Sequence, residues 1–157
     1  MTGILEMENQ LYVKIEARAE MILLRPLDLF VRNLVQQLPG LSSSEDLIDN
    51  VELAFNEAFT NVSKHAYKSN QKGPVCIEIF VQNNYLEIRL EDHGESFDPN
   101  AIADPDFQNL GEGGLGIWFM RHFMDDWIYQ SDQHGKNVLR LIKKIPCEET
   151  TLAVDQP

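Results

Sequence analysis

Five short stretches of the chain have the residue pattern of β-strands, with apolar side chains set at strand spacing. They cover residues 10–17, 75–82, 85–91, 127–131 and 138–145. The second and third stretches are joined through Asn83-Asn84, a dipeptide typical of a hairpin turn. The pattern therefore predicts two hairpins and one further strand near the start of the chain.

Apolar residues at helical spacing predict three helices. They cover residues 20–38, residues 47–68, and a segment that runs from a glycine-rich loop to about residue 125. Pro26 is tolerated only near a helix start, which favours a start near Arg25 for the first helix. Residues 42–46 supply a serine cap and two acids for the start of the second helix.

The order of these elements indicates the fold class. It runs strand, helix, helix, strand, strand, lid segment (residues 95–110, without clear periodicity), helix, strand, strand. This order predicts an α+β two-layer sandwich, in which helices cover one face of a mixed, mostly antiparallel sheet. A single domain is expected over residues 1–146, followed by a flexible tail at 147–157.

Composition narrows the classes of function. The net charge is −12 and the basic residues are scattered, so the chain does not resemble a nucleic-acid-binding protein. No apolar run is long enough to cross a membrane, and the acidic first residues lack the pattern of an export signal, so a cytoplasmic setting is expected. Cys76 and Cys147 form no disulfide framework or metal motif, and Cys76 is expected in the core.

The second helix carries two different faces. Its apolar stripe consists of Ile48, Val51, Phe55, Ala58, Phe59, Val62 and Ala66. The polar face consists of Asn50, Glu57, Asn61, Lys64 and Lys68. A carboxylate at Glu57 can accept a proton, an amide oxygen at Asn61 can bind Mg²⁺, and Lys64 can meet a phosphate. The alternative for this helix alone is an ordinary solvated face.

Asp92-His93-Gly94 ends the third strand and precedes the lid segment. An ionised aspartate only accepts hydrogen bonds, so Asp92 suits the exocyclic amine of adenine and disfavours the carbonyl of guanine. Gly94 would allow backbone or a base to approach closely. The alternative is an Asx-turn at the end of a strand.

Residues 111–117 place four glycines before the third helix, an arrangement that suits a phosphate. Gly111, Gly113 and Gly116 also match the dinucleotide fingerprint, with Asp132 as its acid, but no strand leads into this loop. A phosphate cradle therefore remains, with a flexible loop as the alternative. Trp118, Phe119 and Phe123, in the helix that follows, are expected in the core, and the four histidines have no zinc-ligand spacing.

Three segments in this order resemble the Bergerat-type ATP-binding fold of gyrase, Hsp90-class chaperones and histidine kinases. They are Asn56-Glu-Ala-Phe-Thr-Asn-Val-Ser-Lys-His-Ala-Tyr67, Asp92-His-Gly-Glu-Ser-Phe-Asp-Pro99, and Gly113-Gly-Leu-Gly-Ile117 with Phe123-Met-Asp125. In detail they are similar to the branch of bacterial anti-sigma-factor serine/threonine kinases. The chain departs from that pattern at Ser96, where glycine or proline is usual, and at Lys136 and Asn137, where threonine or serine follows the glycine.

The resemblance implies a role for each matched residue. Glu57 would be the general base that activates the attacking serine, Asn61 would hold Mg²⁺, and Asp92 would bind the adenine amine. Lid residues between Asp98 and Gly113 would close over ATP. The full nucleotide site implied is Asn61, Lys64, His65, Asp92, Gly94, Phe97, Gly113, Gly114, Leu115 and Gly116.

The resemblance also implies partners. The substrate would be a STAS-domain anti-anti-sigma protein, and the kinase would sequester a sigma factor as a homodimer. The alternative is a nucleotide-gated protein-binding module with little or no kinase activity. Glu57 argues against that alternative, because binding alone needs no base, whereas Ser96, Lys136 and Asn137 favour it.

Overall fold

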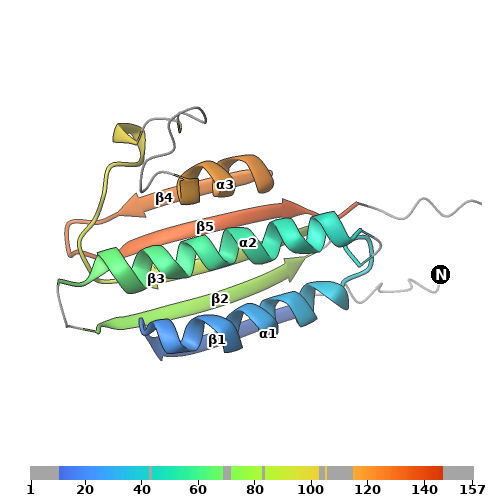
Figure 1. Ribbon diagram of the computed structural model, residues 1–157, viewed down its shortest axis with the longest axis horizontal. Helices are drawn as coiled ribbons and strands as arrows, with labels where there is room; N and C mark the ends of the chain where they lie inside the picture. Colours follow the sequence, from blue (N-terminus) through green and yellow to red (C-terminus); the bar gives the residue numbers. More distant parts are fainter. Residues whose placement is uncertain are drawn as a thin grey trace, which may run out of the picture.

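Five strands form one sheet in the part of the chain that the structure describes. The structure is a computed structural model, and it describes residues 11–42, 44–68, 72–82, 84–102, 105 and 115–146. The strands are β1 (Leu11–Arg18), β2 (Pro74–Gln82), β3 (Tyr85–Asp92), β4 (Asp126–Ser131) and β5 (Asn137–Lys144). They lie in the order β1-β2-β3-β5-β4 (Figure 1). All five correspond to the stretches predicted from the sequence.

Each neighbouring pair of these strands is antiparallel. The sheet was expected to be mixed, but no parallel pair occurs among the described strands. Short turns explain two of the pairings, because a strand that turns back directly can only pair antiparallel with its predecessor. One residue of the predicted β2–β3 turn, Asn83, and the predicted tail at 147–157 lie outside the described residues.

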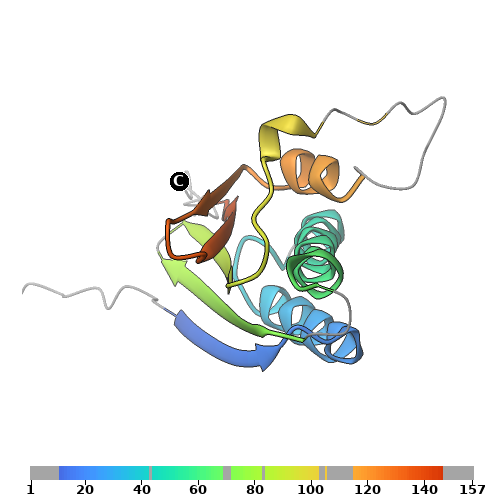
Figure 2. The same ribbon diagram turned by 90° about the vertical axis from the view of Figure 1, so that its left-hand side faces the viewer.

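Three helices cover a single face of the sheet. They are α1 (Leu24–Gln36), which follows a 3₁₀ turn at Met21–Leu23, α2 (Glu45–Asn61) and α3 (Leu115–Phe123). Seen from the side in Figure 2, all three lie on the same side of the strands, which makes two layers. The predicted α+β two-layer sandwich is therefore confirmed, and none of the helices described is long and apolar enough to cross a membrane.

Strand alternation places Cys76 outside the core, contrary to the expectation from the sequence. On β2 the buried positions are Val75, Ile77, Ile79 and Val81. Cys76 lies between them on the opposite face, only partly buried, opposite Glu16 and Glu91 on the neighbouring strands. Because side chains alternate strictly along a strand, a residue of this parity cannot reach the helix layer.

Helix α2 is the central element of the core. Ser44 caps it by accepting a hydrogen bond from the backbone N–H of Leu47 at 3.4 Å, and Glu45 and Asp46 lie in the first turn, as the sequence predicted. The predicted apolar stripe is fully confirmed. Its members, each less than a tenth exposed, are Ile48, Val51, Phe55, Ala58, Phe59, Val62 and Ala66.

The end of α2 differs from the prediction. After Asn61 the chain continues as a π-helical turn over Val62–Ala66, so the predicted helical position of Lys68 is wrong. Tyr67 ends the helix in an extended conformation, where its hydroxyl accepts from the N–H of His93 at 3.1 Å and donates to the carbonyl of Pro74 at 2.5 Å. Single π-helical turns occur frequently at functional sites.

Helix α3 buries a narrower stripe than expected. Ile117 and Met120 are buried on the helix, and Met124, directly after its last residue, continues the stripe. Trp118, Phe119 and Phe123, expected in the core, are only partly buried; Phe119 stacks on Phe123, and Trp118 meets both rings edge-on. The helix also ends at Phe123 rather than at residue 125, because the carboxylate of Asp125 accepts from the backbone of Lys144 on the sheet.

The core position of Phe55 supports a stability prediction. Its ring is completely buried beside Phe59, so Phe55→Ala leaves a cavity and is expected to lower the free energy of unfolding by about 3–5 kcal/mol. The matched control is Phe30→Ala on α1, where the side chain is 38% exposed and a loss below about 1 kcal/mol is expected. Denaturant unfolding measures both, and equal losses would contradict this account of the core.

Candidate functional site

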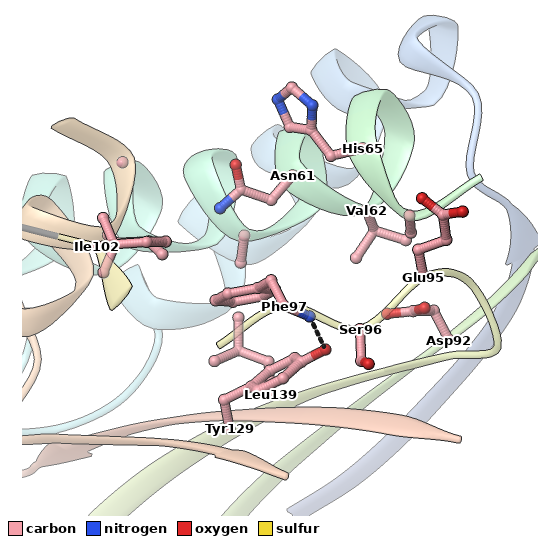
Figure 3. Close-up of a pocket in the computed structure, with 14 residues that line it drawn as sticks. Asn61, Val62, His65, Asp92, Glu95, Ser96, Phe97, Ile102, Tyr129 and Leu139 are labelled. Carbon is pink, nitrogen blue, oxygen red and sulfur yellow. Dashed lines mark hydrogen bonds between the residues drawn. The ribbon is translucent and has the colours of Figure 1, made fainter. Parts of the chain in front are cut away.

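A cavity of about 470 Å³ opens where the π-helical end of α2 faces the segment that follows β3. The first turn of α3 and one residue each from β4 and β5 complete its wall. In Figure 3 the helix supplies Asn61 and His65 on one side, and Tyr129 and Leu139 lie on the sheet side. This volume lies in the range of small-molecule and cofactor pockets.

Several residues predicted from the sequence meet in this cavity. Those that line it are Asn61, His65, Asp92, Phe97 and Gly116. They come from three segments that are far apart in the chain. The spatial convergence that a nucleotide site requires is therefore present in the fold, while the binding role of each residue remains a prediction.

Other predicted residues do not line the cavity. Lys64 is exposed at the π-helical turn. Gly94 does not line the cavity but donates its backbone N–H to Asp92, which does. Leu115 is the first residue of α3 and stands beside the cavity residue Gly116. Gly113 and Gly114, like most of the glycine loop, lie outside the described residues.

Glu57 lies next to the cavity, against the first turn of α3. A β-carbon placed on Gly116 would come within 2.5 Å of Oε2 of Glu57, so a larger residue would push this carboxylate away from the first turn of α3. Burial raises the pKa of Glu57, and the nearby charge of Lys64 partly offsets the effect. A half-buried carboxylate with a raised pKa has the properties of a general base.

A buried hydrogen-bond network fixes Asp92. Its Oδ1 accepts from the backbone N–H of Gly94 at 2.8 Å, which is the Asx-turn considered above, and from Nδ2 of Asn137 at 2.9 Å. The same Nδ2 donates to the carbonyl of Gly94 at 3.1 Å. Among the described residues no partner is bonded to the second carboxylate oxygen of Asp92, so the turn leaves one acceptor available.

Asn137 was noted in the sequence only as a departure from a family pattern. The structure makes it a central polar residue, 1% exposed, directly opposite Asp92 in the β3–β5 pairing. Both of its contacts are acceptors, so its amide must present nitrogen and not oxygen to them. Of the other two departures, Lys136 forms a salt bridge with Glu91 at 2.7 Å and does not line the cavity, whereas Ser96 does.

Position 94 requires glycine because its backbone lies very close to the backbone of Ala66. A β-carbon at this position would lie 2.0 Å from the carbonyl oxygen of Ala66. The next residue, Glu95, donates its N–H to that same carbonyl at 2.6 Å. Gly94 therefore attaches the start of the lid segment to the π-helical turn, which is the backbone approach that the sequence suggested.

Apart from Phe97, the aromatic and aliphatic wall of the cavity on the sheet side was missed by reasoning from the sequence. Tyr129 and Leu139 pair across β4 and β5, and the ring of Tyr129 packs on that of Phe97 with centroids 4.2 Å apart. Ile102 adds a further apolar wall. The sequence predicted a strand over residues 127–131, but no rule of spacing separates a core tyrosine from one that lines a cavity.

Metal binding has one candidate ligand at the site. Within the described residues no group of three or more His, Cys, Asp or Glu side chains is placed to hold a metal ion. The amide oxygen of Asn61, which lines the cavity, is the ligand that the sequence analysis assigned. A single protein oxygen suits Mg²⁺ that is held mainly by phosphates and water.

Comparison with known proteins relates this site to one family. Residues 17–143 match the family model described as histidine kinase-like ATPase domain. A relative from Oceanobacillus iheyensis named serine-protein kinase RsbW is 31% identical over 121 residues, which cover 72% of this chain and 75% of that protein.

Two further relatives carry the same name. The protein from Listeria monocytogenes is 32% identical over 102 residues, covering 57% of this chain and 64% of the relative. The protein from Bacillus subtilis is 37% identical over 93 residues, covering 52% and 56%. The matched part therefore amounts to more than half of each of these chains.

The raised pKa of Glu57 makes stability depend on pH. The folded protein keeps this proton to a higher pH than the unfolded chain, so stability is lost as pH rises above the usual value of 4.5. Glu57→Gln cannot ionise and is expected to have the higher melting temperature at pH 7, with the difference vanishing near pH 4.

Glu16→Gln is the matched control for this measurement. Glu16 is exposed on β1, and its hydrogen bond with Lys14 lowers the pKa of its carboxyl group. Replacing Glu16 should therefore not raise the melting temperature at pH 7. The melting temperatures of the wild type, Glu57→Gln and Glu16→Gln are measured by thermal unfolding between pH 4 and pH 8. If Glu57→Gln melts at a lower temperature than the wild type at pH 7, the carboxylate of Glu57 is not desolvated in the folded protein.

Proposed function

Because the chain belongs to the family of histidine kinase-like ATPase domains, we propose that it is an ATP-dependent serine/threonine protein kinase. One observation carries the proposal: Asn61, Asp92 and Gly116 line one cavity, and Glu57 lies in contact range of Gly116. These residues offer an acceptor for a base amine, an oxygen for a cation, a helix start for phosphates and a base. The names of the relatives, serine-protein kinase RsbW, agree with it.

The proposal extends to the partners. The protein phosphorylates a STAS-domain anti-anti-sigma protein and acts as an anti-sigma factor that sequesters a sigma factor. It works in the cytoplasm as a homodimer. These assignments follow from the resemblance of its three sequence segments to anti-sigma-factor kinases.

Each residue has a defined task in the transfer. The free oxygen of Asp92 accepts from the adenine amine, and the first turn of α3 directs backbone N–H groups toward the phosphates. Asn61 would hold Mg²⁺ through its amide oxygen, and the ion would supply neutralisation of the phosphate charge. Because phosphoryl transfer depends mainly on positioning and electrostatics, few protein groups are needed.

The chemical step requires one proton acceptor. Glu57 takes the proton from the hydroxyl of the substrate serine while that oxygen forms a bond to the γ-phosphorus. The bond from the γ-phosphorus to the β,γ-bridging oxygen breaks at the same time, and ADP leaves with the electron pair. The raised pKa of Glu57 brings its basicity closer to neutral pH, where such a group works best.

Replacing Glu57 separates this function from the alternative of a nucleotide-gated binding module. Glu57→Ala should bind ATP with the affinity of the wild type but transfer phosphate about 10²- to 10⁴-fold more slowly. Labelled ATP, Mg²⁺ and STAS-domain proteins encoded near its gene are used to measure transfer. The control is Glu16→Gln, which replaces a surface glutamate on β1 and should transfer phosphate at the wild-type rate.

Two results would contradict the kinase assignment. If the wild-type protein binds ATP but labels none of these substrates, the binding module is the better description. If Glu57→Ala transfers phosphate as fast as the wild type, another group acts as the base. Binding is measured separately by calorimetry, so a loss of ATP affinity is not mistaken for a loss of chemistry.

The role of Asn61 is tested through the cation. Asn61→Ala should weaken ATP binding about tenfold in the presence of Mg²⁺, as expected for the loss of one ligand to a charged group. In excess chelator the variant and the wild type should bind ATP equally. Asn33→Ala, on the exposed side of α1, is the control that should match the wild type in both conditions. If Asn61→Ala weakens ATP binding equally with and without Mg²⁺, Asn61 is not a ligand of the metal ion.

A further inference from the structure

The hydroxyl group of Tyr129 faces the same cavity as Asp92. Tyr129 comes from β4, and its ring packs on Phe97 with an interplanar angle of 32°. Its oxygen accepts the backbone N–H of Phe97 at 3.4 Å. Figure 3 shows this oxygen directed toward the end of the cavity where Ser96 and Asp92 lie. The side chain is therefore held in place by both its ring and its oxygen.

The proton of this hydroxyl is available for a ligand. The contact with Phe97 uses the oxygen as an acceptor, and no acceptor for the proton is found among the described residues. Burial and the charge of Asp92 raise the pKa of Tyr129, which keeps the phenol neutral. The group is thus a hydrogen-bond donor throughout the physiological pH range.

Asn137 cannot supply such a donor. Its amide has two N–H bonds, and the acceptors within reach are Oδ1 of Asp92 and the carbonyl of Gly94. Its oxygen can only accept. Asn137 is therefore committed to fixing Asp92 and has no N–H left to donate to a base.

Asp92 and Tyr129 together present an acceptor and a donor at one end of the cavity. Adenine carries the complementary pair on one edge, the exocyclic amine as donor and ring nitrogen N1 as acceptor. Guanine has the opposite pair, a carbonyl oxygen and a protonated N1. A site that offers an acceptor beside a donor therefore forms two hydrogen bonds with adenine, whereas guanine would leave both protein groups unpaired.

We infer that Tyr129 is a specificity-determining residue that donates its hydroxyl proton to N1 of adenine while Asp92 accepts from the amine. This inference rests on the proposed ATP-dependent function. Tyr129 would thus supply the hydrogen bond to N1 of adenine that Asn137 cannot supply, because both N–H groups of Asn137 are already used.

The test compares two nucleotides and two proteins. ATP and 1-deaza-ATP, in which N1 is replaced by a C–H group, are titrated by calorimetry into the wild type and Tyr129→Phe. The wild type should bind 1-deaza-ATP about tenfold more weakly than ATP, the size of one hydrogen bond. Tyr129→Phe should bind ATP about tenfold more weakly than the wild type does, but 1-deaza-ATP equally well.

Ser96→Ala is the control, because Ser96 is the other hydroxyl at this end of the cavity and is exposed to water. It should keep the wild-type preference for ATP. The inference is overturned if Tyr129→Phe weakens both nucleotides equally, if it weakens neither, or if the preference is lost in Ser96→Ala instead. Absence of ATP binding by the wild type would overturn the proposed function itself, which is a separate result.

Discussion

The hydrogen bond between Asn137 and Asp92 is the contact on which the site depends. It joins the end of β3 to the start of β5 and, through Gly94, to the first residues of the lid segment. Both side chains are almost completely buried, and their hydrogen bond pairs the amide nitrogen of Asn137 and one oxygen of Asp92, while the amide oxygen of Asn137 is buried without a partner among the described residues. The carboxylate is thereby held with one oxygen occupied and the other directed away from the pair.

Helix α2 links this polar centre to the hydrophobic core. The face that packs on the sheet carries Phe55 and Phe59, whereas Asn61 lies at the point where the helix changes to a π-helical turn. That turn ends at Ala66, whose carbonyl receives the N–H of Glu95. Core packing and site geometry are therefore set by the same element, and neither can shift without the other.

The sequence predicted the regular parts of this molecule well. Strand alternation and helical spacing act locally, so the five strands, the cap at Ser44 and the buried stripe of α2 were all found. Errors arose where tertiary contacts decide. Cys76 is apolar but lies on the outer face of its strand, and Lys68 follows a helix end fixed by Tyr67. Trp118 is only partly buried and stacks on His122.

The candidate site was predictable only in part, for the same reason. Asp92 and Asn61 could be proposed because their chemistry and order are informative within a short segment. The partner of Asp92 lies 45 residues further along the chain, and Tyr129 is brought to Phe97 only by the pairing of β4 with β5. Long-range juxtapositions of this kind leave no periodic trace in a sequence.

The contact of Gly116 with Glu57 has a mechanical consequence. No side chain separates the backbone of α3 from the carboxylate, so any displacement of the helix start alters the amount of water that reaches it. Since burial is the main cause of its high proton affinity, the same displacement changes that affinity. The first turn of α3 therefore sets the proton affinity of Glu57 through the close approach of a single glycine.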